Sequence, residues 1–245
     1  MKILALDSSG LVASVALLEN DNLVAEFTVN NKKTHSQTLL PMLDEVVNAA
    51  GIELDAVDAI AIAAGPGSFT GPRIGAATVK GLSLALDKPV VPVPTLEGLA
   101  YNFWGSDRLI CPIMDARRNQ IDQPVTRNQV YTGLYRFDEA GNLVTEMDQI
   151  PMDVNELIDL LLEKDEEVQF TGDGIQVYGS QILSKMKHAR LAPAHLNKQK
   201  AGSVAYAGAY RYAHEQYING DDFAPEYLRM SQAERERKEK GERNE

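Results

Sequence analysis

The stretch that most constrains the fold covers residues 64–75 and has the sequence AGPGSFTGPRIG. An apolar run directly before it predicts a buried strand, and the small and apolar residues after it predict a helix. Glycines between a strand and a helix allow positive φ angles and a close approach of two backbones. Pro72 suits the first turn of a helix, so the predicted N-cap is Thr70 or Gly71. Free N–H groups at such a helix start suit an anion, although a tight turn without a ligand fits equally well.

Three ligand-binding motifs come close to this stretch without matching it. A dinucleotide fingerprint needs glycine at the position of Thr70, and an acidic residue about 20 positions later, at the end of the next strand. That strand, residues 90–93, has no acidic residue at its end. A P-loop needs a Gly-Lys-Ser/Thr ending, and a nucleophile elbow needs glycines two positions before and after Ser68. Spacing alone therefore identifies no ligand.

Composition argues against several classes of protein, among them nucleic-acid-binding, disulfide-bonded and membrane-spanning proteins. The chain has 245 residues, which suggests one or two domains, and its formal net charge of −11 opposes direct binding to nucleic acid. The single cysteine, Cys111, excludes an internal disulfide and lies in an apolar run, so we expect it to be buried and inert. No apolar run has the length of a membrane span, and the N-terminus leads directly into a predicted strand. We expect a cytoplasmic protein without a membrane partner.

The N-terminal residues predict three strands, 2–9, 12–18 and 23–29, with a hairpin turn joining the last two. The first strand ends in Asp7 and Ser8. This opening resembles that of the actin, Hsp70 and sugar-kinase fold, in which the aspartate lies near phosphate or metal. On the residues alone, Asp7 equally suits the cap of a turn.

Residues 34–50 predict a helix with a capping box formed by Thr34 and Gln37, and with Gly51 as the residue that follows its end. Pro41 is expected to kink or shorten this helix. Its apolar stripe consists of Leu39, Leu43, Val46, Val47 and Ala50.

The second half repeats the pattern of the first. A strand over residues 109–114 is followed by a hairpin partner over 130–137, and residues 121–129 look like a local duplication that lengthens the loop between them. A helix is predicted over 154–162. A second strand, glycine turn and helix then follow over 168–186, and a helix rich in small residues is predicted over 203–217.

The central stretch is very similar to the signature Gly-Pro-Gly-Ser-Phe-Thr-Gly-x-Arg-Ile-Gly of the bacterial TsaB (YeaZ) family, which is glycoprotease-like. Pro72 stands where we expect leucine in that family, and a proline is acceptable at this point of a helix. The segment 225–229, Pro-Glu-Tyr-Leu-Arg, resembles the closing segment of the family. The resemblance extends from residue 3 to about 234, apart from the lengthened loop.

The resemblance implies an α/β fold with two tandem actin-like (ASKHA, ribonuclease H-like) subdomains, each a mixed sheet flanked by helices. We expect subdomains over 1–104 and 105–230, with the last helix packing back toward the first subdomain. Residues 231–245 are expected to form a disordered, charged tail.

The resemblance also implies a function. Family members are non-catalytic scaffold subunits for the formation of N6-threonylcarbamoyladenosine in tRNA. They pair with the catalytic subunit TsaD, are joined by the ATPase TsaE, and contact tRNA only through the complex. The docking face used for TsaD also suits a second copy of the chain, and the sequence does not decide between a homodimer and a monomer when the protein is alone. No cofactor of its own is expected, although ATP or ADP could lie at an interface of the complex.

Two sets of site residues follow. Ala77, Gly81 and Ala85 recur at every fourth position, so they form a stripe that packs either on the chain's own sheet or on a partner helix. With the resemblance, the candidate partner-docking residues are Leu39, Leu43, Val47, Ala77, Gly81 and Ala85. The candidates for a vestigial phosphate or nucleotide site are Asp7, Ser8, Gly65, Gly67, Ser68 and Gly71.

The main alternative is an independent enzyme, either a glycoprotease-like peptidase or a nucleotide-binding enzyme. TsaD carries a His-x-x-x-His metal motif where this chain has His35 and Leu39. A half zincin motif at His214 likewise ends in Ile218, so we expect no metal site and no catalytic residue. Asp7 and the central glycines leave nucleotide binding open.

Overall fold

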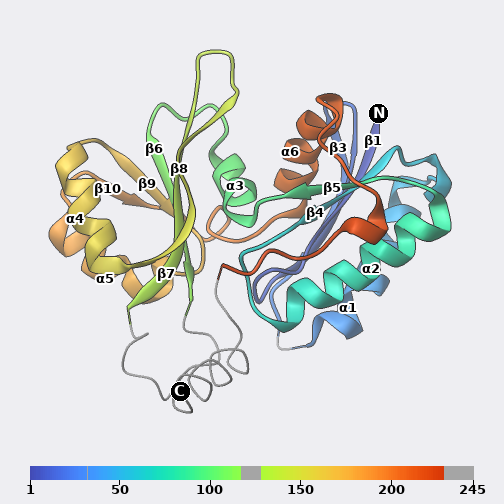
Figure 1. Cartoon of the computed structure of the whole chain (residues 1–245), viewed down its shortest axis with the longest axis horizontal. Coiled ribbons are helices and arrows are strands. Elements are labelled where there is room, and N and C mark those ends of the chain that lie inside the picture. Colours follow the sequence, from blue (N-terminus) through green and yellow to red (C-terminus); the bar gives the residue numbers. More distant parts are fainter. Residues whose placement is uncertain (32, 117–127, 229–245) are drawn as a thin grey trace, which may run out of the picture.

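The computed structural model describes residues 1–31, 33–116 and 128–228. It has two halves side by side, each built on one sheet with helices packed against it (Figure 1). The lengthened loop lies almost entirely outside the described residues, and so does the expected charged tail.

The first sheet has five strands in the order β3-β2-β1-β4-β5. β1, β2 and β3 pair antiparallel, whereas β4 and β5 continue from β1 in parallel. Parallel pairing requires crossover connections, and the helices that follow β3 and β4 supply them. The strands are β1 Lys2–Asp7, β2 Ala13–Glu19, β3 Asn22–Val29, β4 Ala59–Ala63 and β5 Val90–Val93.

The second sheet has the order β10-β9-β6-β7-β8. Taken in chain order within this half, the strands occupy the same positions and directions as those of the first sheet. The fold is therefore a duplicated, actin-like α/β architecture, as predicted. The strands are β6 Leu109–Asp115, β7 Gln129–Phe137, β8 Leu143–Asp153, β9 Val168–Thr171 and β10 Ala189–Leu191.

Helices cover both faces of the first sheet. Side chains alternate along a strand, so Leu4 and Leu6 of β1 face α1 and α2, whereas Ile3 and Ala5 face α6. This explains why β1 is apolar throughout rather than alternating. The last helix thus packs on the first sheet. The α-helices are α1 His35–Ala50, α2 Thr70–Leu86, α3 Thr95–Ala100, α4 Val154–Lys164, α5 Ile175–Lys185 and α6 Ala201–Ala213.

An apolar joint connects the two halves. Leu96 and Leu99 of α3 pack against Ile110 of β6 and against Tyr135 and Phe137 of β7. The other face of the second sheet is covered by α4 and α5. The boundary near residue 104 falls in the short connection after α3, and the division into two subdomains stays a prediction.

Several local predictions were wrong. The side chain of Thr34 makes no capping hydrogen bond. α1 continues through Pro41 without being shortened, and a kink at Pro41 stays a prediction. α2 begins at Thr70, with Phe69 at the N-cap, and α6 ends at Ala213, four residues before the predicted end. Strand β8 was not predicted, and Gln129, assigned to the loop, begins β7.

Candidate functional site

The central glycines bring two backbones together. A Cβ atom on Gly67 would lie 2.5 Å from the carbonyl oxygen of Ser9, and one on Gly71 would overlap the carbonyl oxygen of Ser8. The N–H of Ser68 donates to the Ser9 carbonyl at 2.8 Å. The turn after β4 is therefore pressed against the loop that follows β1, and glycine is required at these contacts.

The C-terminal segment closes the other side of the turn. The N–H of Glu226 donates to the carbonyl of Ala64 at 2.7 Å, and Gly65, at φ +120°, leaves no room for a Cβ against the Glu226 carbonyl. The amide of Gln149, from β8 in the second half, donates to the Gly65 carbonyl at 3.1 Å. Thr95 adds a reciprocal pair of hydrogen bonds with Gly65. The turn thus joins the first sheet, the second sheet and the C-terminal segment.

The polar candidates are held inside the chain. The hydroxyl of Ser8 donates to the Gly71 carbonyl at 2.9 Å, and the hydroxyl of Ser68 accepts from the Gly71 N–H at 3.2 Å. Asp7 is fully buried and accepts from the N–H and the hydroxyl of Ser9. Burial raises the pKa of Asp7 to about 6, an effect that the Ser9 hydrogen bonds reduce.

The six candidates for a vestigial phosphate or nucleotide site therefore do lie together around one turn. Their contacts with the chain's own backbone give them structural roles that require no ligand. Nucleotide binding at this turn stays a prediction.

His35 and His214, the histidines of the two incomplete metal motifs, each lie next to a backbone carbonyl. His35 Nε2 lies 3.0 Å from the carbonyl of Gly10, whereas Leu39, one turn later, is buried in the core. His214 Nδ1 lies 2.7 Å from the carbonyl of Tyr210 at the end of α6. Within the part of the chain that the structure describes, no cluster of three His, Cys, Asp or Glu side chains could hold a metal ion.

Cys111 is buried, as the sequence predicts, and its sulfur lies 3.4 Å from the hydroxyl of Thr132. Burial raises the pKa of its thiol to about 12. The thiol is therefore protonated at neutral pH, and it gives the protein no nucleophile.

The small-residue stripe of α2 faces outward. Ala77, Gly81 and Ala85 are exposed, and no described heavy atom lies within 4 Å of where a Cβ on Gly81 would stand. Leu84, on the same exposed side, is 79% exposed, and Leu40 of the neighbouring helix α1 is 56% exposed. The interpretation that this stripe packs on the chain's own sheet is therefore wrong.

The predicted residues of α1 lie on the inner side of that helix. Leu39 and Leu43 are buried in the core of the first half, and Val47 packs against it. An amphipathic helix turns its apolar stripe toward its own sheet, so Leu39 and Leu43 are not on the outer surface, and Val47 is only partly exposed. The sequence did not identify Leu40 and Leu84 as exposed apolar residues, because a single leucine outside the apolar stripe of a helix forms no periodic pattern.

Comparisons with known proteins agree with this architecture. The family model described as TsaD, tRNA N6-adenosine threonylcarbamoyltransferase, matches residues 22–237. A protein of Bacillus subtilis named tRNA threonylcarbamoyladenosine biosynthesis protein TsaB is 33% identical over 96% of both chains. The Escherichia coli protein of the same name is 35% identical over 58% of each chain. A solved structure of YeaZ from Pseudomonas aeruginosa superposes with a TM-score of 0.70 at 26% identity, covering 93% of this chain and 99% of that one.

The duplicated sheets and the internally packed glycine turn define an actin-like protein of the glycoprotease-like class. The described helices include none that is both long enough and apolar enough to cross a bilayer, and the cytoplasmic location stays a prediction. Identity over almost the full length shows that the chain belongs to the TsaB (YeaZ) family.

Proposed function

We propose that this protein is a non-catalytic scaffold subunit in the formation of N6-threonylcarbamoyladenosine in tRNA. It pairs with a TsaD-type catalytic subunit, and a TsaE-type ATPase joins the pair. Relatives named for this biosynthesis support the pathway. Any ATP or ADP lies at an interface of the complex, and tRNA is contacted through the partners.

The outward stripe on α2 is the observation that supports pairing. Small side chains at Ala77, Gly81 and Ala85 allow a partner helix to approach to the close end of the 8–10 Å range of axis separations. The exposed side chains of Leu40 and Leu84 provide apolar area to bury, with about 25 cal/mol gained per Å².

The same face serves for self-pairing when the catalytic subunit is absent. Two copies each carry a net charge of −11, and this repulsion weakens the homodimer relative to a pair with a less acidic partner. The hetero-pair therefore predominates when both subunits are present.

The test replaces Gly81 with leucine, and the matched control replaces it with alanine. Because the space around Gly81 is open, both variants are expected to fold with unchanged circular dichroism. G81L is expected to weaken co-purification with a TsaD-type subunit by about 30-fold, as for the loss of a central contact, whereas G81A retains most of it. Full affinity of G81L would place the docking face elsewhere.

The pathway is tested separately by depleting the protein in its host and measuring tRNA nucleosides by mass spectrometry. N6-threonylcarbamoyladenosine is expected to fall. Unchanged levels would contradict the proposed function itself, independently of where the partner docks.

A further inference from the structure

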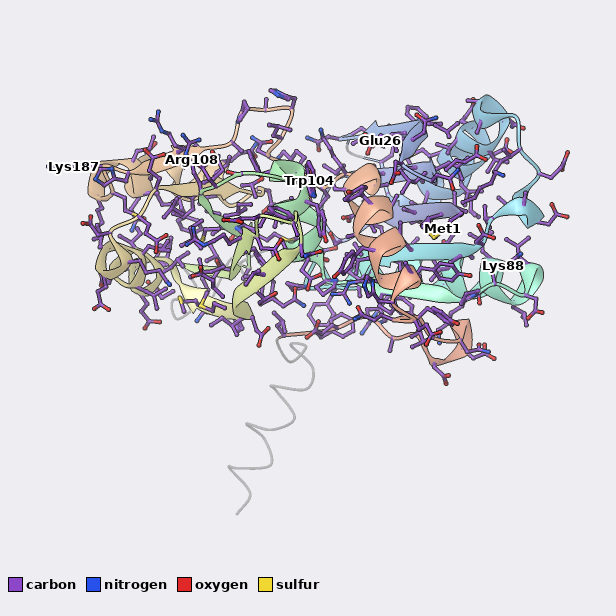
Figure 2. The ribbon with its side chains drawn as sticks, turned by 90° about the horizontal axis from the view of Figure 1, so that it is seen from above. Met1, Glu26, Lys88, Trp104, Arg108 and Lys187 are labelled. Carbon is purple, nitrogen blue, oxygen red and sulfur yellow. The ribbon has the colours of Figure 1, made fainter. Side chains whose placement is uncertain are left out.

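Trp104, the only tryptophan of the chain, is held between the two halves and is still 55% exposed (Figure 2). Its indole N–H donates to the carbonyl of Gly141, in the β7–β8 turn, at 3.2 Å. Its ring meets that of Tyr206 on α6 edge to face, with 6.3 Å between centroids. A Cβ on Gly141 would lie 2.9 Å from the indole, so this glycine permits the close contact. A fixed, exposed aromatic ring is typical of a recognition surface.

A hollow lies on each side of the indole. One, of about 510 Å³, lies between β3, the turn before it and the start of α6, and its aromatic lining includes Tyr101 and Tyr206. The other, of about 360 Å³, lies between the segment 104–107 and the β7–β8 turn. The rings of Phe137, Tyr101, Tyr206 and Trp104 follow one another in edge-to-face contacts across both halves. The two hollows thus form one aromatic surface centred on Trp104.

The rim of this surface is acidic. Five carboxylates line the two hollows, whereas Lys200 is the only basic residue among the lining residues described. Two of the five already accept backbone hydrogen bonds, Glu26 from Gly202 and Asp138 from Asn142. The other three, which are exposed and form no ion pair with described residues closer than 4 Å, are Asp21, Asp107 and Glu139.

We propose that this Trp104 surface docks a basic segment of a partner protein, in which a Lys or Arg stands next to an apolar residue. The apolar side chain packs on Trp104 and Tyr206, and the cation lies among the carboxylates and over the ring faces, where it is attracted by both. RNA is disfavoured, because the rim repels phosphates.

The surface is separate from the proposed docking face on α2. α6 covers the face of the first sheet opposite to α1 and α2, so a basic segment and a catalytic subunit can be bound at the same time. The proposal therefore does not rest on the proposed function.

The full-length protein supplies its own reporter, because all tryptophan fluorescence comes from Trp104. The probes are the pentapeptides Arg-Leu-Arg-Leu-Arg, Glu-Leu-Glu-Leu-Glu and Ser-Leu-Ser-Leu-Ser, with blocked ends. The basic peptide is expected to shift the emission to the blue in a saturable way that added salt weakens, whereas the other two produce no saturable change. Equal responses to all three peptides, or no response, would overturn the proposal.

Variants test the charges and the ring. The triple variant D21N/D107N/E139Q is expected to weaken binding of the basic peptide by about tenfold, the sum of three exposed ion pairs. The control E156Q/D159N/E163Q removes three exposed charges from α4 and is expected to bind within about twofold of the wild type. Y206L, which retains the reporter, is expected to weaken binding as well.

Equal weakening in the α4 control would show a general effect of net charge and overturn the proposal. So would a saturable blue shift with a single-stranded RNA oligonucleotide that competes with the basic peptide. Co-purification of the triple variant with a TsaD-type subunit separates this surface from the α2 face, and it is expected to be unchanged.

Discussion

The two strand–glycine turn–helix units of this protein share one feature, a close contact between turn glycines and the backbone of a neighbouring segment, but the surroundings of the two turns differ. In the first half, the turn between β4 and α2 presses Gly67 and Gly71 against the carbonyls of the loop after β1. In the second half, the turn between β9 and α5 presses Gly172 and Gly174 against the carbonyl of Ile113 in β6. The N–H of Gly174 donates to that carbonyl at 2.9 Å. Both units thus place glycines where the turn meets the backbone of the first strand of its half or of the loop after that strand, and in both the glycines permit this close packing.

The surroundings of the two turns differ. The first turn is covered by the C-terminal segment and by Gln149 from the other half. At the second turn, the buried Asp173 accepts from the N–H of Asp115 within its own half. The first turn therefore joins the two halves, whereas the hydrogen bonds described for the second turn link residues of its own half. In both turns of this fold, the glycines are explained by a close backbone contact, so their presence alone does not indicate a bound ligand.

The largest expected effect comes from adding a methyl group at Gly71. G71A would drive Cβ into the Ser8 carbonyl, and we expect the free energy of unfolding to fall by about 3 kcal/mol in urea titrations. G172A in the second half should cost a similar amount, because it combines a contact with the Ile113 carbonyl and a φ of +91°.

The matched control is G81A, the same substitution in open space on the same helix. It should raise stability by about 1 kcal/mol, through helix propensity. A neutral G71A would contradict the role of the central glycines in packing, and a neutral G172A would show that only the first unit uses this device.

A smaller effect is expected from the buried carboxyl at the end of β1. The pKa of Asp7 is raised to about 6 in the folded state from 3.8, so between pH 4 and 6 the folded state binds the extra proton. The Asp7 contribution to the free energy of unfolding therefore falls as the pH rises through this window and stays low above it. The D7N variant removes this loss of stability, because an amide does not ionise. At pH 8 we expect D7N to be more stable than the wild type by about 2 kcal/mol. This is somewhat less than the pKa shift of Asp7 implies, because the buried N–H₂ group of the new asparagine would lack a hydrogen-bond acceptor.

The measurement is the difference in unfolding free energy between wild type and D7N at several pH values, which cancels the other carboxylates. The control S14A removes a buried hydroxyl of the same sheet and adds no titrating group. Its difference from the wild type should be flat with pH. A flat D7N difference as well would mean that Asp7 titrates normally.

The sequence predicted most of the fold and less of its surfaces. Strands buried on both faces are apolar throughout, and turns rich in glycine interrupt the pattern, so the paired units were evident. β8 was missed because much of it is exposed and it contains Pro151, which weakens the strand signal. Leu39 and Leu43 formed a clear periodic stripe, but such a stripe faces the chain's own core. Trp104 follows a short helix without any pattern, and only the three-dimensional arrangement shows its neighbours.

The smallest expected effect tests whether the first turn is a joint between the halves. Gln149 donates to the carbonyl of Gly65 and to the carboxylate of Glu226, whereas its Oε1 is buried without a described partner. Q149A should therefore cost only about 1 kcal/mol in global stability. Locally, amide exchange of Glu226, whose N–H donates to Ala64, should become faster as the C-terminal segment loosens. The matched control is Q181A, which removes a hydrogen bond to Asn155 within the second half and should leave Glu226 exchange unchanged. Unchanged exchange in Q149A would mean that contacts with the first half, such as the Ala64 hydrogen bond and the stacking of Tyr227 on Phe69, suffice to hold the segment. The two glycine turns would then differ less than their contacts indicate.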